Sequence, residues 1–123
     1  MIAEALAGKR IAITGATGFV GTALVERLLR SVPHCELVLL VRDGKRTSAA
    51  RRTEREILRN DAFDRLRAEH GDDFTAHVSA RVTTIAGDVT RDGLGLNDVD
   101  RLTFASCDVV IHSAAAVSFD SPL

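Results

Sequence analysis

Residues 14–21 read TGATGFVG, and this short stretch decides the fold. It follows an apolar run at residues 10–13 and precedes a helical pattern at residues 19–31, so its glycines lie at a strand-to-helix turn. A pyrophosphate needs unobstructed backbone N–H donors, and the first turn of a helix supplies them together with the positive end of its dipole. The stretch therefore predicts a dinucleotide pyrophosphate site.

Each glycine of this stretch has a role that requires a missing Cβ. Gly15 allows the tight turn off the strand, Gly18 lets the backbone approach the phosphates, and Gly21 lets the helix pack closely on the strand. The spacing is GxxGxxG rather than the GxGxxG of the dehydrogenase fingerprint, and a glycine-rich turn that binds nothing is the alternative. Thr22 stands where a Walker loop has lysine, which excludes that class of phosphate-binding loop.

The end of the second predicted strand indicates which dinucleotide binds. Residues 36–41 (ELVLLV) are a continuous apolar run, as expected for a strand covered on both faces, and they deliver Arg42 to the carboxyl edge of the sheet. A guanidinium makes bidentate contacts to a phosphate, which NADP carries on its 2′ oxygen and NAD lacks, and Lys45 follows within reach. NADP is therefore favoured. Asp43 keeps NAD open, because a carboxylate can hold a ribose, and Arg42 as a solvated strand-end cation is the other alternative.

The composition indicates a soluble globular domain. The chain has 123 residues, a net charge of −1 and 46% hydrophobic residues, with no nucleic-acid signature. The amino terminus lacks a secretory signal and no apolar run reaches transmembrane length, so a cytoplasmic location is expected. Cys35 and Cys107 lie outside any CxxC or metal-ligand spacing and are expected to be reduced thiols, and no metal site is predicted.

The apolar pattern predicts an α/β fold, a Rossmann-like doubly wound parallel sheet. Its helices are expected at residues 19–31 and 97–105, with Val20, Leu24 and Leu28 facing the core from the first of them. Right-handed crossovers give the strand order 3-2-1-4, with the cofactor crevice between strands 1 and 4. The predicted strands are residues 10–14, 37–41, 81–86 and 108–112.

Residues 43–80 are too many for the usual crossover and are expected to form a helical insertion. Helices are predicted at residues 47–60 and 62–70. Arginines make the first of these helices basic, which would attract the phosphates of a nucleotide or of coenzyme A. Glu54 and Glu56 interrupt the run, and they favour a solvated face on which the charges form ion pairs. The arginines are Arg51, Arg52, Arg55 and Arg59.

The chain resembles the extended short-chain dehydrogenase/reductase superfamily, and within it the fatty acyl-CoA reductases of the male-sterility type. The glycine motif alone indicates only the superfamily. The long insertion and the motif after the fourth strand narrow the resemblance to acyl-CoA reductases and to similar reductase domains that release thioester-bound acyl chains. The matching stretches span nearly the whole chain. They are GKRIAITGATGFVG at 8–21, LLRSVP at 28–33, LVR at 40–42, FDRLR at 63–67, GDVT at 87–90 and IHSAAAVSF at 111–119.

The resemblance implies a cofactor site along the carboxyl edge of the sheet. It assigns the 2′-phosphate to Arg42 and the adenine to Asp88 and Val89, although Asp88 would equally cap a turn. His112 is expected to be a hydrogen-bonded supporting residue rather than a catalyst. The small residues Ser113, Ala114 and Ala115 would let the ribose and nicotinamide pass close to the backbone, or would simply pack against the first helix. The residues expected to hold the pyrophosphate are Thr14, Gly15, Thr17, Gly18, Phe19, Val20 and Gly21.

The implied activity is NADPH-dependent reduction of a long-chain fatty acyl-CoA, or a carrier-bound acyl thioester, to a fatty aldehyde or alcohol. The family uses a Ser or Thr with a Tyr-x-x-x-Lys, and this chain contains no tyrosine. The chain is therefore expected to be the amino-terminal part of a single NADP-binding domain, with the substrate-binding part and the catalytic residues absent, and to bind cofactor without catalysing a reaction.

The sequence leaves two alternative functions, and it also predicts self-association. A sugar-nucleotide epimerase or dehydratase shares the glycine motif, but its segment after the second strand is usually short. A non-catalytic NADP-binding module would account for the missing tyrosine. The fourth strand would be an exposed apolar edge without a fifth strand beside it, and self-association through that edge is expected.

Overall fold

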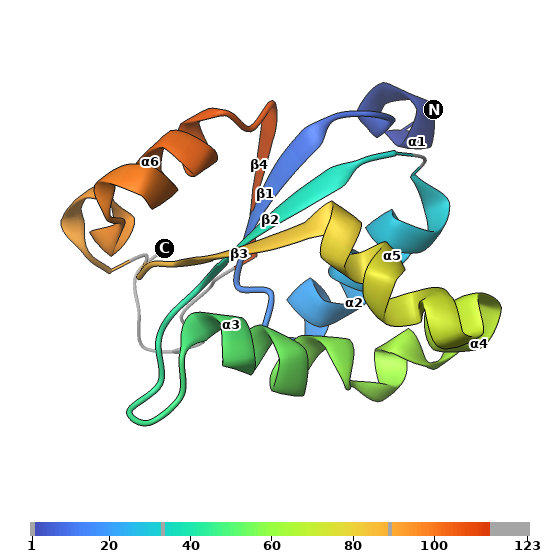
Figure 1. Ribbon diagram of the computed structural model, residues 1–123. Helices are drawn as coiled ribbons and strands as arrows, with labels where there is room; N and C mark the ends of the chain where they lie inside the picture. Colours follow the sequence, from blue (N-terminus) through green and yellow to red (C-terminus); the bar gives the residue numbers. More distant parts are fainter. Residues whose placement is uncertain (1, 33, 89, 114–123) are drawn as a thin grey trace, which may run out of the picture.

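The computed structural model describes residues 2–32, 34–88 and 90–113, and four parallel strands form one sheet across them in the order β3-β2-β1-β4 (Figure 1). The predicted strand order is thus confirmed. Val89, Ala114 and Ala115, which the sequence placed in the site, lie outside the described residues. The strands are β1 (Arg10–Thr14), β2 (Glu36–Val41), β3 (Val82–Ala86) and β4 (Val109–His112).

The two central strands are apolar along almost their whole length because both faces of the sheet are covered. After their first residue, β1 and β2 are buried at every position, and Ile13 is in register with Leu39 on one side and Ile111 on the other. The edge strand β4 is less covered, and its Val110 is 52% exposed.

Alternate residues of the strands point into two separate apolar clusters. Ile11, Ile13 and Leu39 pack with α2 (Phe19–Ser31) on one face. Ala12, Val38 and Leu40 face the other way, where Leu96 and Phe104 join them. Figure 1 shows α6 (Asp98–Ala105) on the side of the sheet opposite α2. The short amino-terminal helix is α1 (Ile2–Leu6).

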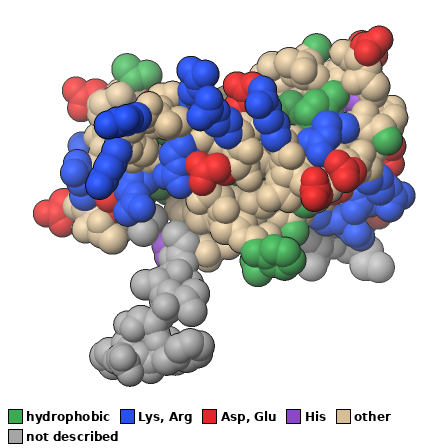
Figure 2. Space-filling view, turned by 90° about the horizontal axis from the view of Figure 1, so that it is seen from below, with side chains coloured by type: hydrophobic (Ala, Val, Ile, Leu, Met, Phe, Trp, Pro, Cys, Tyr) green, Lys and Arg blue, Asp and Glu red, His purple; other side chains and the backbone are tan. Residues whose placement is uncertain are grey.

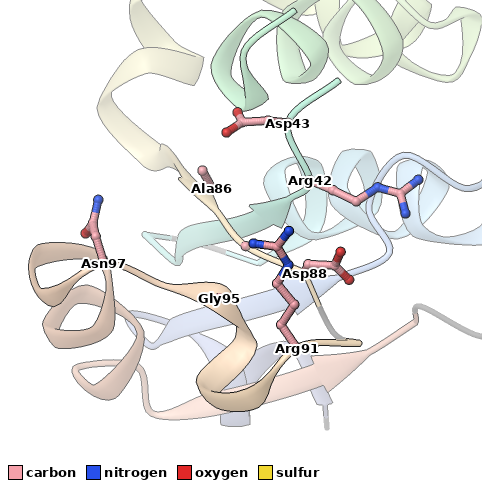
Figure 3. Close-up of a pocket in the computed structure, with 8 residues that line it drawn as sticks. Arg42, Asp43, Ala86, Asp88, Arg91, Gly95 and Asn97 are labelled. Carbon is pink, nitrogen blue, oxygen red and sulfur yellow. The ribbon is translucent and has the colours of Figure 1, made fainter. Parts of the chain in front are cut away.

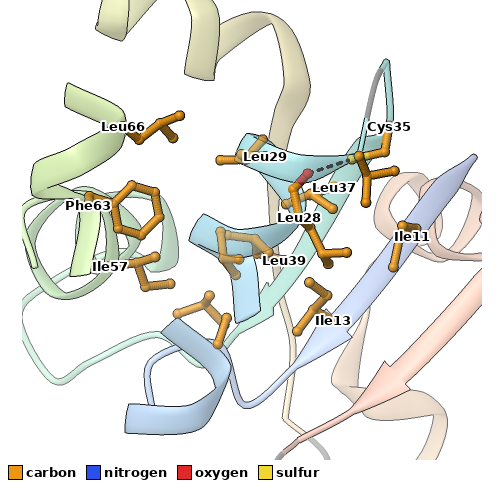
Figure 4. Packing of buried hydrophobic residues seen from close by; sticks show 14 of the residues in the cluster. Ile11, Ile13, Leu28, Leu29, Cys35, Leu37, Leu39, Ile57, Phe63 and Leu66 are labelled. Carbon is orange, nitrogen blue, oxygen red and sulfur yellow. Dashed lines mark hydrogen bonds between the residues drawn. The ribbon is translucent and has the colours of Figure 1, made fainter. Parts of the chain in front are cut away.

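The insertion is helical, as predicted, and it packs against α2. Ile57, Phe63 and Leu66 are fully buried, and they extend the apolar cluster from α2 into the insertion (Figure 4). Phe63 also meets Phe74 edge to face at 6.4 Å between ring centroids. The elements are α3 (Ala49–Arg52), the π-helix η1 (Thr53–Leu58), the 3₁₀ helices η2 (Asp61–Phe63) and η3 (Gly71–Asp73), α4 (Asp64–His70) and α5 (Phe74–Arg81).

Two details of the helices differ from the sequence prediction. Val20 is 69% exposed, so its placement in the core stripe was wrong; the first turn of α2 lies at the carboxyl edge of the sheet. The buried face of that helix is formed by Val25, Leu28 and Leu29. The sequence analysis also did not predict α5, of which only Val78 is buried.

Arg81, the last residue of α5, ties the insertion to the end of α2. Its guanidinium donates hydrogen bonds to the carbonyl oxygens of Leu29 (2.8 Å), Val32 (2.8 Å) and Cys35 (2.9 Å). These carbonyls lie at the carboxyl end of a helix and in the turn after it, where backbone acceptors lack partners. Cys35 and Cys107 are both free thiols, as expected.

Candidate functional site

The turn between β1 and α2 is held by its own backbone. Gly15 has a left-handed φ of 75°, which favours glycine, and its carbonyl accepts a 3.1 Å hydrogen bond from the Gly18 N–H. The hydroxyl of Thr22 donates to the Ala16 carbonyl at 2.6 Å. The turn therefore has a fixed shape before any ligand arrives.

Gly21 brings the helix so close to this turn that no side chain fits between them. A Cβ added at Gly21 would lie 2.1 Å from the Gly15 carbonyl oxygen, and one at Gly18 would lie 3.3 Å from the same atom. The packing role predicted for Gly21 is thus visible as a backbone-to-backbone contact.

The amino terminus of α2 is open to an anion. Its N-cap is Gly18, which contributes no side-chain hydrogen bond, and the first turn of this helix contains no acidic residue. The side chains that follow turn outward, since Phe19 is 92% exposed, while Thr17 is half-buried. Backbone N–H groups at the positive end of a 13-residue helix, beside a turn that contains two glycines, fit a pyrophosphate.

A side-chain hydrogen bond joins the ends of β1 and β4 next to this turn. Thr14 is buried, and its hydroxyl oxygen lies 2.7 Å from Nδ1 of His112. The N–H of Ser113 donates to the Thr14 carbonyl at 3.0 Å, which brings Ser113 to the same edge. The hydrogen bond expected of His112 is thus present.

A polar hollow of about 430 Å³ opens beyond the carboxyl ends of β2 and β3 (Figure 3). The predicted residues Arg42 and Asp88 both line it, but Lys45 does not. Arg91, which the sequence analysis did not single out, lines the hollow from the loop before the 3₁₀ helix η4 (Asp92–Gly95). The signal that would have found Arg91 is its place three residues after Asp88, in a turn-rich segment that stays at the same edge.

Asp88 caps its own turn and also faces the hollow. Its Oδ1 accepts hydrogen bonds from the Thr90 hydroxyl (2.6 Å) and the Thr90 N–H (2.9 Å). These bonds, with smaller contributions from the Arg42 and Arg91 guanidinium groups, hold the pKa of Asp88 below its ordinary value. The carboxylate is therefore ionised near neutral pH.

Asp43, whose carboxylate is the reason why NAD remained an alternative to NADP in the sequence analysis, has a structural role. Its Oδ1 accepts a 2.7 Å hydrogen bond from the Ala49 N–H at the start of α3. The adjoining backbone is also anchored, because Arg52 donates to the Arg42 carbonyl at 2.5 Å. The Arg42 guanidinium itself has no ion pair within the part of the chain that the structure describes.

Ion pairs cross the arginine-rich face of the insertion. Arg52 contacts Glu56 at 2.6 Å and Arg59 contacts Glu54 at 3.2 Å, so two of the predicted basic side chains are paired. The bond with Arg52 lowers the pKa of Glu56. Figure 2 shows acidic side chains among the Lys and Arg side chains of this face. The prediction that this face is solvated and that its charges form ion pairs is thus correct for Arg52 and Arg59.

Neither a metal centre nor a membrane span is found where the structure is described. Within residues 2–32, 34–88 and 90–113, no cluster of three or more His, Cys, Asp or Glu side chains is arranged to hold a metal ion. Over the same ranges, none of the helices combines the length and the apolar character that crossing a bilayer demands.

Comparison with known proteins gives a consistent family. The family model described as "Male sterility protein", an NAD-binding model, matches residues 13–123. Fatty acyl-CoA reductase 1 of Arabidopsis thaliana is 36% identical over 94% of this chain and 24% of its own length. The alcohol-forming fatty acyl-CoA reductase of Simmondsia chinensis is 37% identical (96% and 24%), and fatty acyl-CoA reductase 1 of Mus musculus is 39% identical (99% and 23%).

A solved structure is similar as well. The PhqB reductase domain from Penicillium fellutanum superposes with a TM-score of 0.63 and 28% identity, over 93% of this chain and 29% of that domain. The chain spans about a quarter of the length of the curated relatives named above.

Proposed function

The chain belongs to the family of the male sterility protein, and from that premise we propose that it is the NADPH-binding part of a reductase that converts a long-chain fatty acyl-CoA to a fatty aldehyde or fatty alcohol. The observation that carries the proposal is the close contact between Gly21 and the Gly15 backbone, which leaves no room for a side chain between the glycine turn and the first turn of α2. The names of the relatives, which are fatty acyl-CoA reductases, support the substrate class.

The glycine turn would hold the pyrophosphate. The backbone N–H groups at the start of α2 would donate to its oxygens, and the dipole of this helix would stabilise the charge. The rigidity of the turn means that little conformational entropy is lost on binding, because the Gly15–Gly18 hydrogen bond is already made.

Two side chains after β2 support NADPH rather than NADH. Arg42 lines the hollow, and its guanidinium forms no ion pair with any other described residue, which suits a 2′-phosphate. The Asp43 carboxylate accepts from the Ala49 N–H, so turning it toward a ribose would leave the start of α3 without this cap.

The bound cofactor would supply a hydride to the thioester carbonyl carbon, and the carbon–sulfur bond would then break to release coenzyme A as the free thiol. The residues of this chain would bind and orient the reactants: the Thr14–His112 hydrogen bond fixes the ends of β1 and β4, and Ser113 follows at that edge. The protein contributes positioning here, and a proton donor of the tyrosine type is not among the 123 residues.

A non-catalytic NADP-binding module is the second candidate, because it would need only the glycine turn and the hollow, and both are formed by described residues. An epimerase or dehydratase of sugar nucleotides is less well supported. The long segment after β2 is packed into the main core through Ile57, Phe63 and Leu66, whereas the segment expected for that class is short.

The test is NADPH oxidation by the protein at its natural full length, with a long-chain acyl-CoA as substrate and with NADH and a UDP-sugar as controls. Turnover that needs both NADPH and the acyl-CoA supports the reductase. Tight NADPH binding without turnover of either substrate would support the binding module instead, and turnover of the UDP-sugar would overturn the substrate class.

A further inference from the structure

We propose that Arg91 is a second phosphate-binding guanidinium of the hollow, acting with Arg42 on the 2′-phosphate and so setting the preference for NADPH over NADH. The inference rests on the proposed function and adds to it a residue that the sequence analysis did not assign. It follows from how the Arg91 backbone is held, how its side chain is directed, and which charges surround it.

The loop that carries Arg91 is closed on itself by backbone hydrogen bonds. The Arg91 N–H donates to the Asp88 carbonyl (3.0 Å), and the Arg91 carbonyl accepts from the Leu94 N–H (3.0 Å). The Asp88 N–H in turn donates to the Leu94 carbonyl at 2.7 Å. The starting point of the Arg91 side chain is therefore fixed relative to the end of β3.

The stem of Arg91 lies across Gly95. A Cβ added at Gly95 would approach the Arg91 Cδ to 3.1 Å and its Cβ to 3.6 Å, so the missing side chain leaves room for the stem. Both residues line the hollow, as does Arg42, and Figure 3 shows the Arg91 guanidinium near Asp88, with the Arg42 side chain extending away from it. The side chain is thus directed by packing, which lowers the entropy lost when it binds a ligand.

Two guanidinium groups, those of Arg42 and Arg91, line the hollow together with the carboxylates of Asp43 and Asp88. Across the described ranges, neither Arg42 nor Arg91 has a carboxylate within ion-pair distance. Asp88 lies close enough for the charges of both guanidinium groups to lower its pKa, but its Oδ1 already accepts hydrogen bonds from Thr90. A 2′-phosphate carries a charge of roughly −1.5 to −2 and offers several acceptor oxygens, which matches two arginines better than one.

NADH presents a neutral hydroxyl at the same position, so it gains little from either guanidinium. Arg91 should therefore affect NADPH and NADH differently, whereas a residue that only supports the loop would affect both alike. Lys45, which the sequence favoured as the second cation, does not line the hollow and should contribute less.

The experiment is calorimetric titration of the protein at its natural full length with NADPH and with NADH. Arg91→Met keeps the apolar stem and removes the charge, and Arg91→Lys keeps a charge without the planar fork. Arg27→Met is the matched control, because Arg27 is an exposed arginine of α2 that does not line the hollow. Thermal unfolding of each variant checks that the fold is kept.

Arg91→Met is expected to raise the Kd for NADPH about tenfold, with less than a twofold change for NADH, and Arg91→Lys should fall between. Arg27→Met should change neither. Equal effects of Arg91→Met on both nucleotides, or no effect on NADPH, would overturn the role of Arg91 while leaving the proposed function intact. A wild-type protein that binds both nucleotides equally would overturn the NADPH proposal and this inference together.

Discussion

The hydroxyl of Thr14 and Nδ1 of His112 lie 2.7 Å apart, and their hydrogen bond joins the ends of β1 and β4 where the glycine turn begins. Thr14 is buried, so the bond is shielded from water on that side. The pair fixes the spacing between the two strands that border the predicted cofactor crevice.

Replacing Thr14 by Val should therefore lower the free energy of unfolding by about 1 kcal/mol, because the shape is kept and the hydrogen bond is lost. Urea unfolding of Thr14→Val, His112→Ala and the double variant would measure the coupling. Additive losses in the double variant would show that the two side chains do not stabilise one another.

Gly21→Ala should be far more damaging than its size suggests. The added Cβ would lie 2.1 Å from the Gly15 carbonyl oxygen, so the helix and the turn must separate, at a cost of roughly 1–3 kcal/mol and with loss of dinucleotide binding. Gly44→Ala is the control, since its nearest neighbour would be 3.4 Å away. Thermal unfolding and NADPH titration of both variants test this, and unimpaired binding by Gly21→Ala would contradict it.

Arg42→Ala should weaken NADPH binding by about 1–2 kcal/mol and leave NADH nearly unchanged, as for the loss of one charge-assisted contact. Lys45→Ala removes a neighbouring cation that does not line the hollow, and it should have a smaller effect. Direct titration with both nucleotides decides the point. Equal losses for NADPH and NADH would mean that Arg42 does not contact the 2′-phosphate.

Arg81→Met should cost about 2–3 kcal/mol of unfolding free energy, because three backbone carbonyls lose a charged donor. Arg65→Met is the matched control: Arg65 forms an exposed ion pair with Glu69, which is worth about 0–1 kcal/mol. Urea denaturation compares the two. Similar losses in both variants would argue against a special role for Arg81.

Stability should fall as the solution is made mildly acidic, through His77. Burial, followed by the charges of His70 and Arg81, lowers the pKa of His77 below its ordinary value of 6.5. The unfolded chain then binds a proton at a pH where the folded chain does not, so the contribution is fully present above pH 6.5 and is lost as the pH falls below it.

Unfolding temperatures of the wild type and of His77→Gln, recorded from about pH 7.5 to about pH 5.5, test this titration. The variant should lose stability less steeply over that interval. The ring of His77 stacks on His70 at 3.9 Å, so His70→Gln is the companion variant, and it should lessen the slope by a smaller amount. Parallel curves for the wild type and His77→Gln would exclude His77 as the cause.

The βα unit around the glycine turn could be predicted residue by residue. The bounds Arg10–Thr14 and Phe19–Ser31 were predicted correctly, because a continuous apolar run and a regular helical pattern meet at the glycines. The parallel order of the strands followed from the handedness of the crossovers. These features depend on local pattern, which a single sequence carries.

The parts that were missed depend on contacts between distant segments. Only one residue of α5, Val78, is buried. The position of this helix is fixed by the hydrogen bond from Arg81 to a carbonyl oxygen of α2, and such a bond produces no periodic pattern of apolar residues in the sequence. Arg91 enters the hollow because its loop folds back through the Asp88–Leu94 hydrogen bond. Val20 has the spacing of a core residue, but it lies in the first turn of its helix, where it is exposed.

The pairing of β1 with β4 has a consequence for how the protein reaches its native state. Thr14 and His112 are 98 positions apart, so the edge they share cannot form until almost the whole stretch between them has been synthesised. The glycine turn and α2 are contiguous and can assemble early, whereas closing so long a loop is entropically slow. Until β4 pairs with β1, a ribosome-bound chain would therefore lack one border of the proposed cofactor crevice.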